Sequence, residues 1–565
     1  MTTVSSTAST TTTAASTAST TTTSGTKTTT SVDWDALIAA QVATKTAQAT
    51  TIDTKITANE AKIAAYQSLQ TLLSTLSTDT DSLSDSIVNS LSSSVYGTRA
   101  ATITTTGDVS ASAALSMSIS NGAATGDHTL TISQIAEAQK VLGSAVSDQT
   151  AELGYAGTFS LGLADGTSAD ISVSSGMSLE DLVDAINAQT STTNVQASII
   201  QVSSTDFEMV LSATKDNADI VTSSVSGDDV MNELGVTDSS GDFTNVLQVA
   251  QAAVFTLDGI SITRDTNDIT DVLSGVTFNL LQTTPTGATV NIAIEADTSS
   301  IETALQTFVT SYNAFRDYVA GQQTLASDGT VDSTSVLFGD GTLRDITTQM
   351  EQALNSSIGG LSLSDLGLSF DETNDLVLDT SVLSTTMTNS LDDVISLLAN
   401  RVTPSSSSLA VVNIGTSVPA SFTLDLVVDG SGSLTSASVG GDSSLFTVSG
   451  NSIIGKSGTI YAGLAFTYTG STSQSIAITA TSGIAAQIHS IAKSTSNTST
   501  GTIQSVITNL QAQDDTMQTQ IDDINARAAV YKDMLTAQYA KYQSAISSAN
   551  SMLDYLSALL NSSGN

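Results

Sequence analysis

The C-terminal part of the chain carries apolar side chains at every seventh position, and neither proline nor glycine occurs between residues 503 and 560. Two rows, offset by four residues, form the a and d positions of a heptad repeat: Ile503, Leu510, Met517, Ile524 and Tyr531, and Ile521, Ala528, Leu535, Tyr542, Ala549 and Leu556. Asp514 and Gln538 interrupt the pattern. A helix of this length would measure roughly 85 Å, which favours a coiled coil or an exposed leg over a helix in an ordinary bundle.

A second heptad repeat near the N-terminus offers a partner for the first. Asp33 is expected to cap a helix that begins at Trp34. Apolar residues then recur every seven positions, with a companion row beside them: Val42, Ala49, Ile56 and Ile63, then Ile38 and Ile52. After these the register shifts, and the row continues through Leu69, Leu76 and Leu83, as expected for a stutter or a new helix.

The two repeats predict a coiled-coil seam, and its pairing could lie within one chain or between chains. Trp34, the single tryptophan, is either an anchor for apolar packing at the helix start or a contact residue in an assembly. The residues predicted to form the seam are Trp34, Ile38, Val42, Ile52, Ile56, Ile63, Ile524, Tyr531, Leu535, Tyr542, Met552 and Leu556.

Between its helical ends the chain alternates apolar and polar residues, as strands with one buried face do. The order of helix, β insert, helix, β insert and helix predicts an α+β multidomain fold, with terminal coiled-coil helices and a helical stem bundle carrying inserted β-rich domains. The predicted parts are a disordered Ser/Thr-rich tail (1–31), leg and stem helices (32–97), a discontinuous β-rich domain (98–150 and 247–297), an inserted β/α domain (151–246), a helical stem (298–403), an additional β-rich insert (404–480), and a C-terminal stem helix and leg (481–565).

Composition narrows the classes of function. The net charge is −39, so phosphate backbones and anionic lipids repel the chain, and we expect neither nucleic-acid binding nor membrane insertion. Cysteine is absent, and the two histidines, His128 in an expected β turn and His489 at an expected helix start, lack a metal-binding spacing. The first 31 residues lack the basic start and apolar core of a cleaved signal peptide. We expect no enzymatic activity, no cofactor and no metal site.

Two segments imitate ligand-binding motifs. The segment Gly450–Ser457, GNSIIGKS, fits the phosphate-loop pattern G-x-x-x-x-G-K-[ST]. The residues after it alternate like a strand, so we expect no helix to supply the N-terminus that binds phosphate, and we interpret the segment as a glycine turn between strands. The acidic segment Arg264–Asp271 lacks the spacing of an EF-hand and is interpreted as a turn with solvated carboxylates.

Several longer segments occur in an order that is informative as a set. They include VDWDALIAAQV, GDHTLTISQIAEAQKVLGSA, AQAAVFTLDGISITRDTNDITDVLSGVTFNLLQTTPTGATVNIAIEAD, LQTFVTSYNAF, LSDLGLSFDETNDLVLDTSVL and YKDMLTAQYAKYQSAISSANSMLDYLSALL. In content and order they resemble the family of bacterial flagellar filament cap proteins, also called flagellar hook-associated protein 2. The resemblance extends from about residue 31 to 560.

The resemblance implies a secreted protein at the tip of the flagellar filament, exported by the flagellar type III route without a cleaved signal peptide. Several copies would form a homo-oligomeric ring beneath which flagellin subunits fold and insert, and the coiled-coil seam would be its self-assembly or filament interface. The implied partners are flagellin, hook–filament junction proteins and a cytoplasmic export chaperone. Host-surface glycans or mucin would be a further partner if the chain also acts as an adhesin. Two alternatives stay open: a flagellin or hook–filament junction protein, and a surface adhesin built from β modules.

Overall fold

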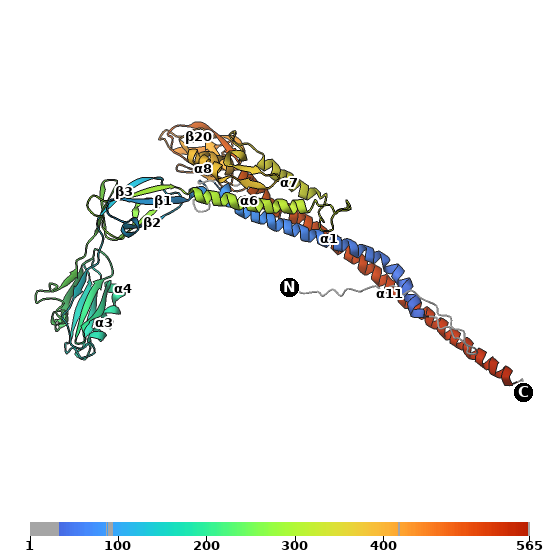
Figure 1. The fold of residues 1–565 in the computed structure, drawn as a ribbon, viewed down its shortest axis with the longest axis horizontal. Coiled ribbons are helices and arrows are strands. Elements are labelled where there is room, and N and C mark those ends of the chain that lie inside the picture. Colours follow the sequence, from blue (N-terminus) through green and yellow to red (C-terminus); the bar gives the residue numbers. More distant parts are fainter. Residues whose placement is uncertain (1–32, 86–87, 89–93, 416–417, 563–565) are drawn as a thin grey trace. The chain divides into compact units, whose positions relative to one another are not determined.

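The computed structural model describes residues 33–85, 88, 94–415 and 418–562 of the chain (Figure 1). The predicted disordered tail of residues 1–31 lies outside them. The described residues form two compact units, one containing those up to Ala64 and from Val506 onward, the other Ala65–Ser505. The predicted α+β multidomain class is confirmed.

The first unit is a pair of long helices, here called the leg. It consists of residues 33–64, with most of them in helix α1 (Trp34–Ser84), and of the part of helix α11 (Thr502–Ser562) that follows residue 505. The expected cap is present, since the Ala36 amide donates to the Asp33 carboxylate at 2.9 Å. Helix α1 continues without interruption to Ser84, so the register shift after Ile63 lies within one helix and does not mark the start of a new one.

The second unit contains a helical stem. Its helices are residues 65–84 of α1, α6 (Thr298–Gly321), α7 (Gly341–Leu354), α8 (Thr380–Asn389), α9 (Leu391–Leu398) and α10 (Ile484–Ser496), with short 3-10 turns at η1 (Val95–Gly97) and η2 (Leu363–Leu366). Leu69, Leu73 and Leu76 of α1 are fully buried here. His489 of α10 lies 2.8 Å from the Ser77 carbonyl oxygen and so joins α10 to α1.

The stem also contains a small β-hairpin, although the sequence predicted only helices for residues 298–403. Strands β16 (Leu368–Phe370) and β17 (Leu376–Leu378) form it. The Asn313 side chain of α6 both donates to the carbonyl and accepts from the amide of Leu376, each at 2.9 Å. The backbone of β17 is therefore hydrogen-bonded to a side chain of α6. Strands of only three residues show too little alternation for the sequence to predict this tertiary contact.

The discontinuous β-rich domain consists of two antiparallel sheets that enclose an apolar core. The larger sheet has the order β1-β15-β3-β11-β12, with β1 (Arg99–Thr106), β15 (Thr289–Ala296), β3 (Gly126–Gln134), β11 (Ala253–Leu257) and β12 (Ile260–Arg264). The smaller sheet has the order β13-β14-β2, with β13 (Asp268–Leu273), β14 (Val276–Leu280), β2 (Leu115–Ile119) and the short helix α2 (Ala111–Ala114) before it. Phe255 and Phe278, one from each sheet, are fully buried between them.

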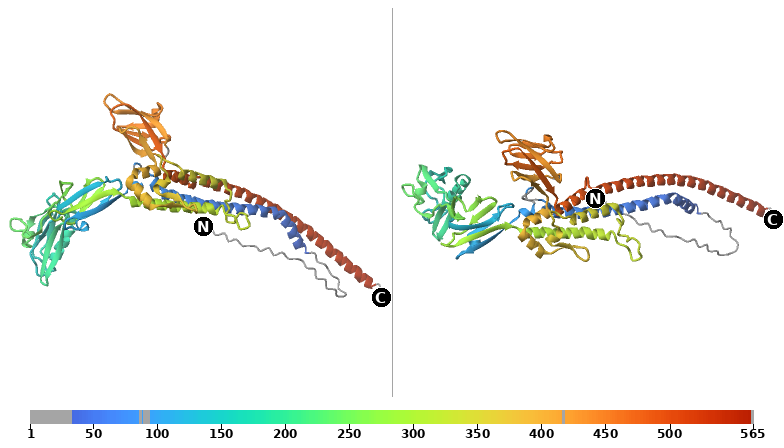
Figure 2. Two further views of the ribbon diagram at one scale, coloured as in Figure 1. Left: turned by 45° about the horizontal axis from the view of Figure 1, so that its top comes forward. Right: turned by 90° about the horizontal axis from the view of Figure 1, so that it is seen from above.

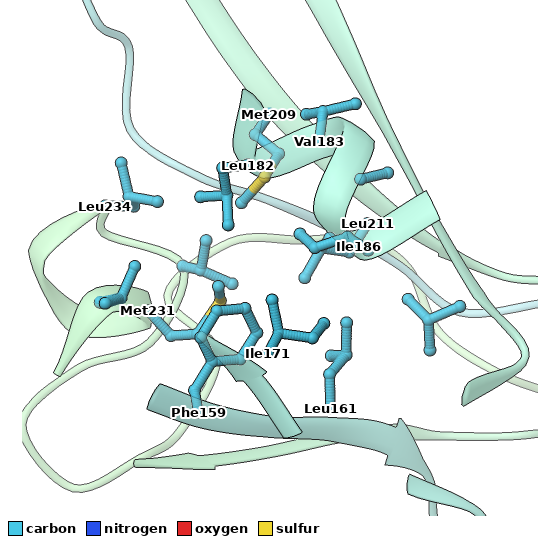
Figure 3. Packing of buried hydrophobic residues seen from close by; sticks show 14 of the residues in the cluster. Phe159, Leu161, Ile171, Leu182, Val183, Ile186, Met209, Leu211, Met231 and Leu234 are labelled. Atoms are coloured by element: carbon cyan, nitrogen blue, oxygen red, sulfur yellow. The ribbon is translucent and has the colours of Figure 1, made fainter. Parts of the chain in front are cut away.

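The inserted β/α domain packs two further sheets around a separate core. One has the order β10-β4-β8-β7, with β10 (Val246–Gln248), β4 (Lys140–Leu142), β8 (Asp206–Ala213) and β7 (Val195–Ser203); the other has the order β6-β5-β9, with β6 (Ser168–Val173), β5 (Gly157–Leu163) and β9 (Ile220–Gly227). Helix α3 (Leu179–Asn187) covers the core, and α4 (Thr190–Thr193) and α5 (Val230–Glu233) are short. Phe159 and Leu161 face Leu182 of α3 in this core (Figure 3).

The boundary predicted between residues 150 and 151 is wrong. Strand β4, at 140–142, pairs with β8 of the inserted domain, and Val141 is fully buried in that domain's core. At the other end, β10 at 246–248 pairs with β4 and extends the domain past residue 246. Three-residue strands carry too little alternation to be assigned to a sheet from sequence.

The additional insert is a β-sandwich. Its sheets have the orders β18-β25-β20-β21 and β19-β24-β23-β22, with β18 (Arg401–Pro404), β25 (Gln474–Thr481), β20 (Ser421–Val428), β21 (Leu434–Ser438), β19 (Leu409–Ile414), β24 (Leu464–Tyr468), β23 (Ser452–Gly455), β22 (Phe446–Ser449) and the turn η3 (Ser443–Leu445). The insert is the orange, strand-rich part of Figure 2, and it lies in the chain between α9 and α10. The insert begins at Arg401, before the predicted start at 404, because Pro404 is tolerated at the end of an edge strand.

Candidate functional site

The predicted seam forms within one chain, and its two helices run antiparallel. Trp34 contacts Tyr539, and Asn59 contacts Asp514 at a point 25 residues further along α1. The two residue numbers of each pair add to the same value, 573. The register between α1 and α11 is therefore constant over this stretch of the leg.

Aromatic and amide side chains close the end of the seam at which α1 begins. The Trp34 and Tyr539 rings are stacked, with centroids 4.9 Å apart and planes inclined by 25°. Gln41 donates to the Tyr539 hydroxyl at 2.9 Å and accepts from the Tyr531 hydroxyl at 3.1 Å. The Lys45 ammonium lies 5.4 Å from the centroid of the Tyr531 ring, within the range of a cation–π contact. Trp34 is thus an anchor of the intra-chain seam.

Most other predicted seam residues lie where the heptad repeat puts them, between the two helices. Ile38 and Leu535 are buried, together with Ala49, Ile521 and Ala528 from the same rows. The half-buried members of the predicted set are Trp34, Val42, Ile52, Ile56, Ile63, Ile524 and Tyr531. A two-helix seam cannot bury its members as fully as a globular core, because each side chain keeps one flank open to water.

One polar contact interrupts the apolar seam. The Asn59 side-chain amide donates to Asp514 Oδ1 at 2.7 Å, and both residues are half-buried. Asp514 is the residue at which the repeat appears broken in the sequence. This polar residue has a hydrogen-bonding partner on α1. A polar pair inside a coiled coil fixes the register of the two helices at some cost in stability.

The predicted seam residues beyond residue 540 have no partner helix among the described residues. Tyr542, Met552 and Leu556 are 47%, 65% and 50% exposed. Other large apolar side chains in the same stretch of α11 are exposed as well: Ile546, Leu553, Tyr555, Leu559 and Leu560. The place of these three residues in a paired seam stays a prediction, because the described part of α1 begins at Trp34, opposite Tyr539.

Sequence reasoning missed Tyr539, Gln41 and Asn59 as seam residues. Gln538 occupies the expected a position but is exposed and donates to the Tyr542 hydroxyl at 2.8 Å. Tyr539 takes the inward position instead, four residues after Leu535, which is the step that a stutter introduces. The four-residue step from Leu535 to Tyr539 was the sequence signal that could have identified Tyr539. Gln41 and Asn59 gave no such signal, because the heptad pattern is read from apolar residues.

The segment that resembles a phosphate loop is a β-hairpin, as interpreted from the sequence. Gly450, with φ of +56°, and Asn451 connect β22 to β23, and Gly455 is the last residue of β23. The Lys456 amide donates to the Leu445 carbonyl at 2.9 Å. No helix follows in the described part of the insert, so the segment has no helix N-terminus with which to bind phosphate.

The acidic segment Arg264–Asp271 contains the end of β12, the turn at residues 265–267 and the start of β13. An ion pair closes it, with Arg264 and Asp271 3.0 Å apart, and the pKa of the Asp271 carboxyl is lowered by that hydrogen bond. The Asn267 side chain bonds the Ala136 backbone and so holds the turn. Among the described residues no group of three or more His, Cys, Asp or Glu side chains is arranged to hold a metal ion.

His128 lies in strand β3, and its expected position in a turn is wrong. It contacts the Asp258 carboxylate at 2.8 Å. In the part of the chain that the structure covers, we find no helix with both the length and the apolar character that a membrane span needs.

Family models match most of the chain. The model described as flagellar hook-associated protein 2 C-terminus matches residues 250–551, and the corresponding N-terminus model matches residues 30–139. A third model, the flagellin hook IN motif, matches residues 158–215.

Individual relatives and solved structures agree with these matches. The flagellar hook-associated protein 2 of Escherichia coli K12 is 29% identical over 353 residues, which cover 60% of this chain and 70% of that protein. The A-type flagellar hook-associated protein 2 of Pseudomonas aeruginosa is 24% identical and covers 64% of this chain and 76% of its own length. The crystal structure of the flagellar cap protein FliD D1-D2-D3 domains from Escherichia coli has a TM-score of 0.50 at 21% identity, covering 79% of this chain and 99% of that one, and supports the fold.

Proposed function

The chain belongs to the flagellar hook-associated protein 2 family of flagellar cap proteins, and we propose that it closes the distal tip of the filament and promotes the folding and insertion of exported flagellin beneath it. It is an oligomeric, filament-associated cap protein located at the filament tip. The family is a structural one, and the alternatives of a flagellin, a junction protein or an adhesin are not favoured.

The observation that carries the proposal is the change in exposure along α11. Up to Tyr539 its inward side chains are covered by α1, whereas from Tyr542 onward they are exposed. At the constant register of the leg, residues 541–560 would correspond to residues 13–32, which contain no Leu, Ile, Met or aromatic residue. An exposed apolar row that no described residue of its own chain covers is suited to contacts with other chains.

We extend the proposal to the partners that such contacts need. Copies of the chain would form a ring, and the row containing Tyr542, Met552 and Leu556 would contact flagellin or hook–filament junction proteins. Before export the same apolar row would need a cytoplasmic chaperone to shield it from aggregation. The absence of cysteine suits export by the flagellar type III route, in which folding follows secretion. Host-surface glycans or mucin have no supporting feature in the described residues.

Deletion of the gene in the source bacterium tests the function. We expect cells with hooks but without filaments, and flagellin lost as monomer to the medium. Normal filaments would contradict the proposal, provided that no second cap gene is present. Absence of both filaments and secreted flagellin would indicate an export defect or a flagellin instead.

A pair of variants in the complemented strain then tests the exposed row. The triple change Met552→Ser, Leu553→Ser and Leu556→Ser removes apolar surface without removing a contact seen within the chain. We expect it to lower filament length. The matched control is Ser547→Ala with Ser548→Ala, which changes two exposed polar positions of the same helix. The control should leave filaments unchanged.

A further inference from the structure

The leg has two flanks, one on each side of its seam. One groove of about 360 Å³ is lined by Lys45, Gln48, Ile524, Arg527, Ala528 and Tyr531. A second groove, on the other flank, is lined by Asp35, Ile38, Ala39, Val42, Ala43, Thr46, Lys532 and Thr536. Gln48 immediately precedes the seam residue Ala49, whereas Ala43 immediately follows the seam residue Val42, so the two grooves lie on opposite sides of the seam.

The first flank is basic. Lys45 and Arg527 line its groove. Residues seven apart in a coiled coil share a face, so Lys55 and Lys62, which follow Gln48 by seven and fourteen residues, lie on this flank, as does Lys541, fourteen after Arg527. All five cations are exposed, and a carboxylate, that of Asp523, lies one turn before Arg527.

The second flank is acidic. Asp35 lines its groove, and Asp53 and Glu60 follow Thr46 by seven and fourteen residues. On α11, Asp522 and Asp515 precede Thr536 by fourteen and twenty-one residues, and Asp533 lies one turn before Thr536. These six carboxylates are exposed, with Lys532 as the single cation among them.

The charges of the two flanks are not neutralised within the leg. Among the described residues no Lys or Arg of the leg lies within 4.0 Å of a carboxylate oxygen. On the register of the seam, the basic residues lie level with positions 511 to 541 of α11 and the acidic residues level with positions 513 to 538. Two charge rows of opposite sign that cover nearly the same positions, on opposite sides of one helix pair, are complementary to each other in a second copy.

We propose that the basic flank of one leg docks against the acidic flank of the leg of a second copy, side by side and in the same direction. The direction rests on the proposed function, because the legs of a ring of caps must point the same way. Contact between like flanks is disfavoured by repulsion, so the interface is heterologous, which is the kind of interface from which a ring of identical subunits is built. Exposed charges are screened by salt, so the leg contacts weaken as ionic strength rises.

Engineered cysteines test this arrangement, and the natural chain contributes no background because it has none. Met534 follows Arg527 by seven residues, so it lies on the basic flank, and it is 53% exposed. Thr536 lines the acidic groove. In adjacent parallel legs they are level within about 3 Å along the axis. The two positions are two residues apart in the same helix, so their side chains point to opposite sides. Cysteines at these positions therefore cannot form an intramolecular disulfide.

The full-length double variant, Met534→Cys with Thr536→Cys, is expressed in the deletion strain and its flagellar fraction is mildly oxidised. We expect a ladder of covalent oligomers on a non-reducing gel, and no ladder from either single variant. Dimers from the Met534→Cys variant alone would indicate contact between like flanks and overturn the proposal. Filaments that elongate normally with no ladder from the double variant would overturn it too, while leaving the cap function intact.

Charge exchange provides the second arm. In the double-cysteine background, Lys55→Glu, Lys62→Glu and Arg527→Glu together should abolish the ladder. Adding Asp515→Lys, Asp522→Lys and Asp533→Lys should restore it, because the flanks are again complementary with their signs exchanged. If the ladder persists in the variant with the three Lys or Arg to Glu changes, while circular dichroism shows unchanged helix content, the contact between legs does not depend on these charges and the proposal is overturned. If deletion of the gene leaves the filaments normal, the cap function itself is rejected, independently of the contact between legs.

Discussion

Asn59 and Asp514 meet inside the seam of the leg, where the Asn59 amide donates to the Asp514 carboxylate at 2.7 Å. Replacing Asn59 with Ala leaves a half-buried carboxylate without this donor, and we expect the leg to lose about 1 kcal/mol of stability. Thermal unfolding followed by circular dichroism measures the change. Thr54→Ala, at an exposed position of the same helix, is the control and should differ little from the parent.

Replacing both members of this pair with leucine should have the opposite effect on stability. A buried polar pair in a coiled coil specifies register but stabilises less than leucine does. The double variant Asn59→Leu with Asp514→Leu should therefore melt at a higher temperature than the parent. A lower melting temperature would show that the pair contributes net stability.

The stacking of Trp34 on Tyr539 makes the only tryptophan of the chain a reporter of leg closure. The Tyr539→Ala change removes the stacked ring and should cost about 1 kcal/mol. The emission of Trp34 should shift to longer wavelength because the indole becomes more exposed to water. Tyr555→Ala, which removes a ring that is 67% exposed, is the matched control and should leave the emission unchanged.

Gly455 is the position in the sandwich insert that tolerates a side chain least. A Cβ there would lie 1.9 Å from the Tyr461 carbonyl oxygen, a backbone atom that can move only with its strand connection. We expect Gly455→Ala to destabilise the insert by about 3 kcal/mol. Limited proteolysis of the full chain during heating would show earlier cleavage within 401–481. Gly430→Ala, where a Cβ meets nothing within 4 Å, should be cleaved like the parent.

Asp297 makes the stability of the stem depend on pH. It caps α6, and hydrogen bonds from Ser299 and Ser300 lower the pKa of its carboxyl below the ordinary 3.8. Because the pKa of this carboxyl is lower in the folded than in the unfolded chain, its ionised form stabilises the fold at pH values above the ordinary pKa. This stabilisation is lost as the pH falls through the lowered pKa. Asp297→Ala should cost about 1 kcal/mol at pH 7. The difference from the parent should shrink below pH ~4, and a difference that stays constant with pH in chemical denaturation would contradict this account.

The sequence by itself determined the helical ends, the β-rich middle and most of the seam. These features depend on local periodicity, because apolar side chains must fall on one face of a helix or strand to be buried. The same reasoning identified the hairpin at Gly450, since an alternating segment after Lys456 cannot supply a helix N-terminus. Ile38 and Leu535, which the repeat places on the apolar face of their helices, are both buried.

Only the tertiary structure decided where these elements pair. Strand β4 belongs to the inserted domain because it hydrogen-bonds to β8, more than sixty residues away, and three residues carry no signal of that partner. Likewise, the pairing of Asn59 with Asp514 and the end of the seam at Trp34 depend on the register between two helices that lie far apart in the sequence. Periodicity specifies which face of an element is apolar, whereas register is fixed by contacts between side chains that only the folded chain brings together.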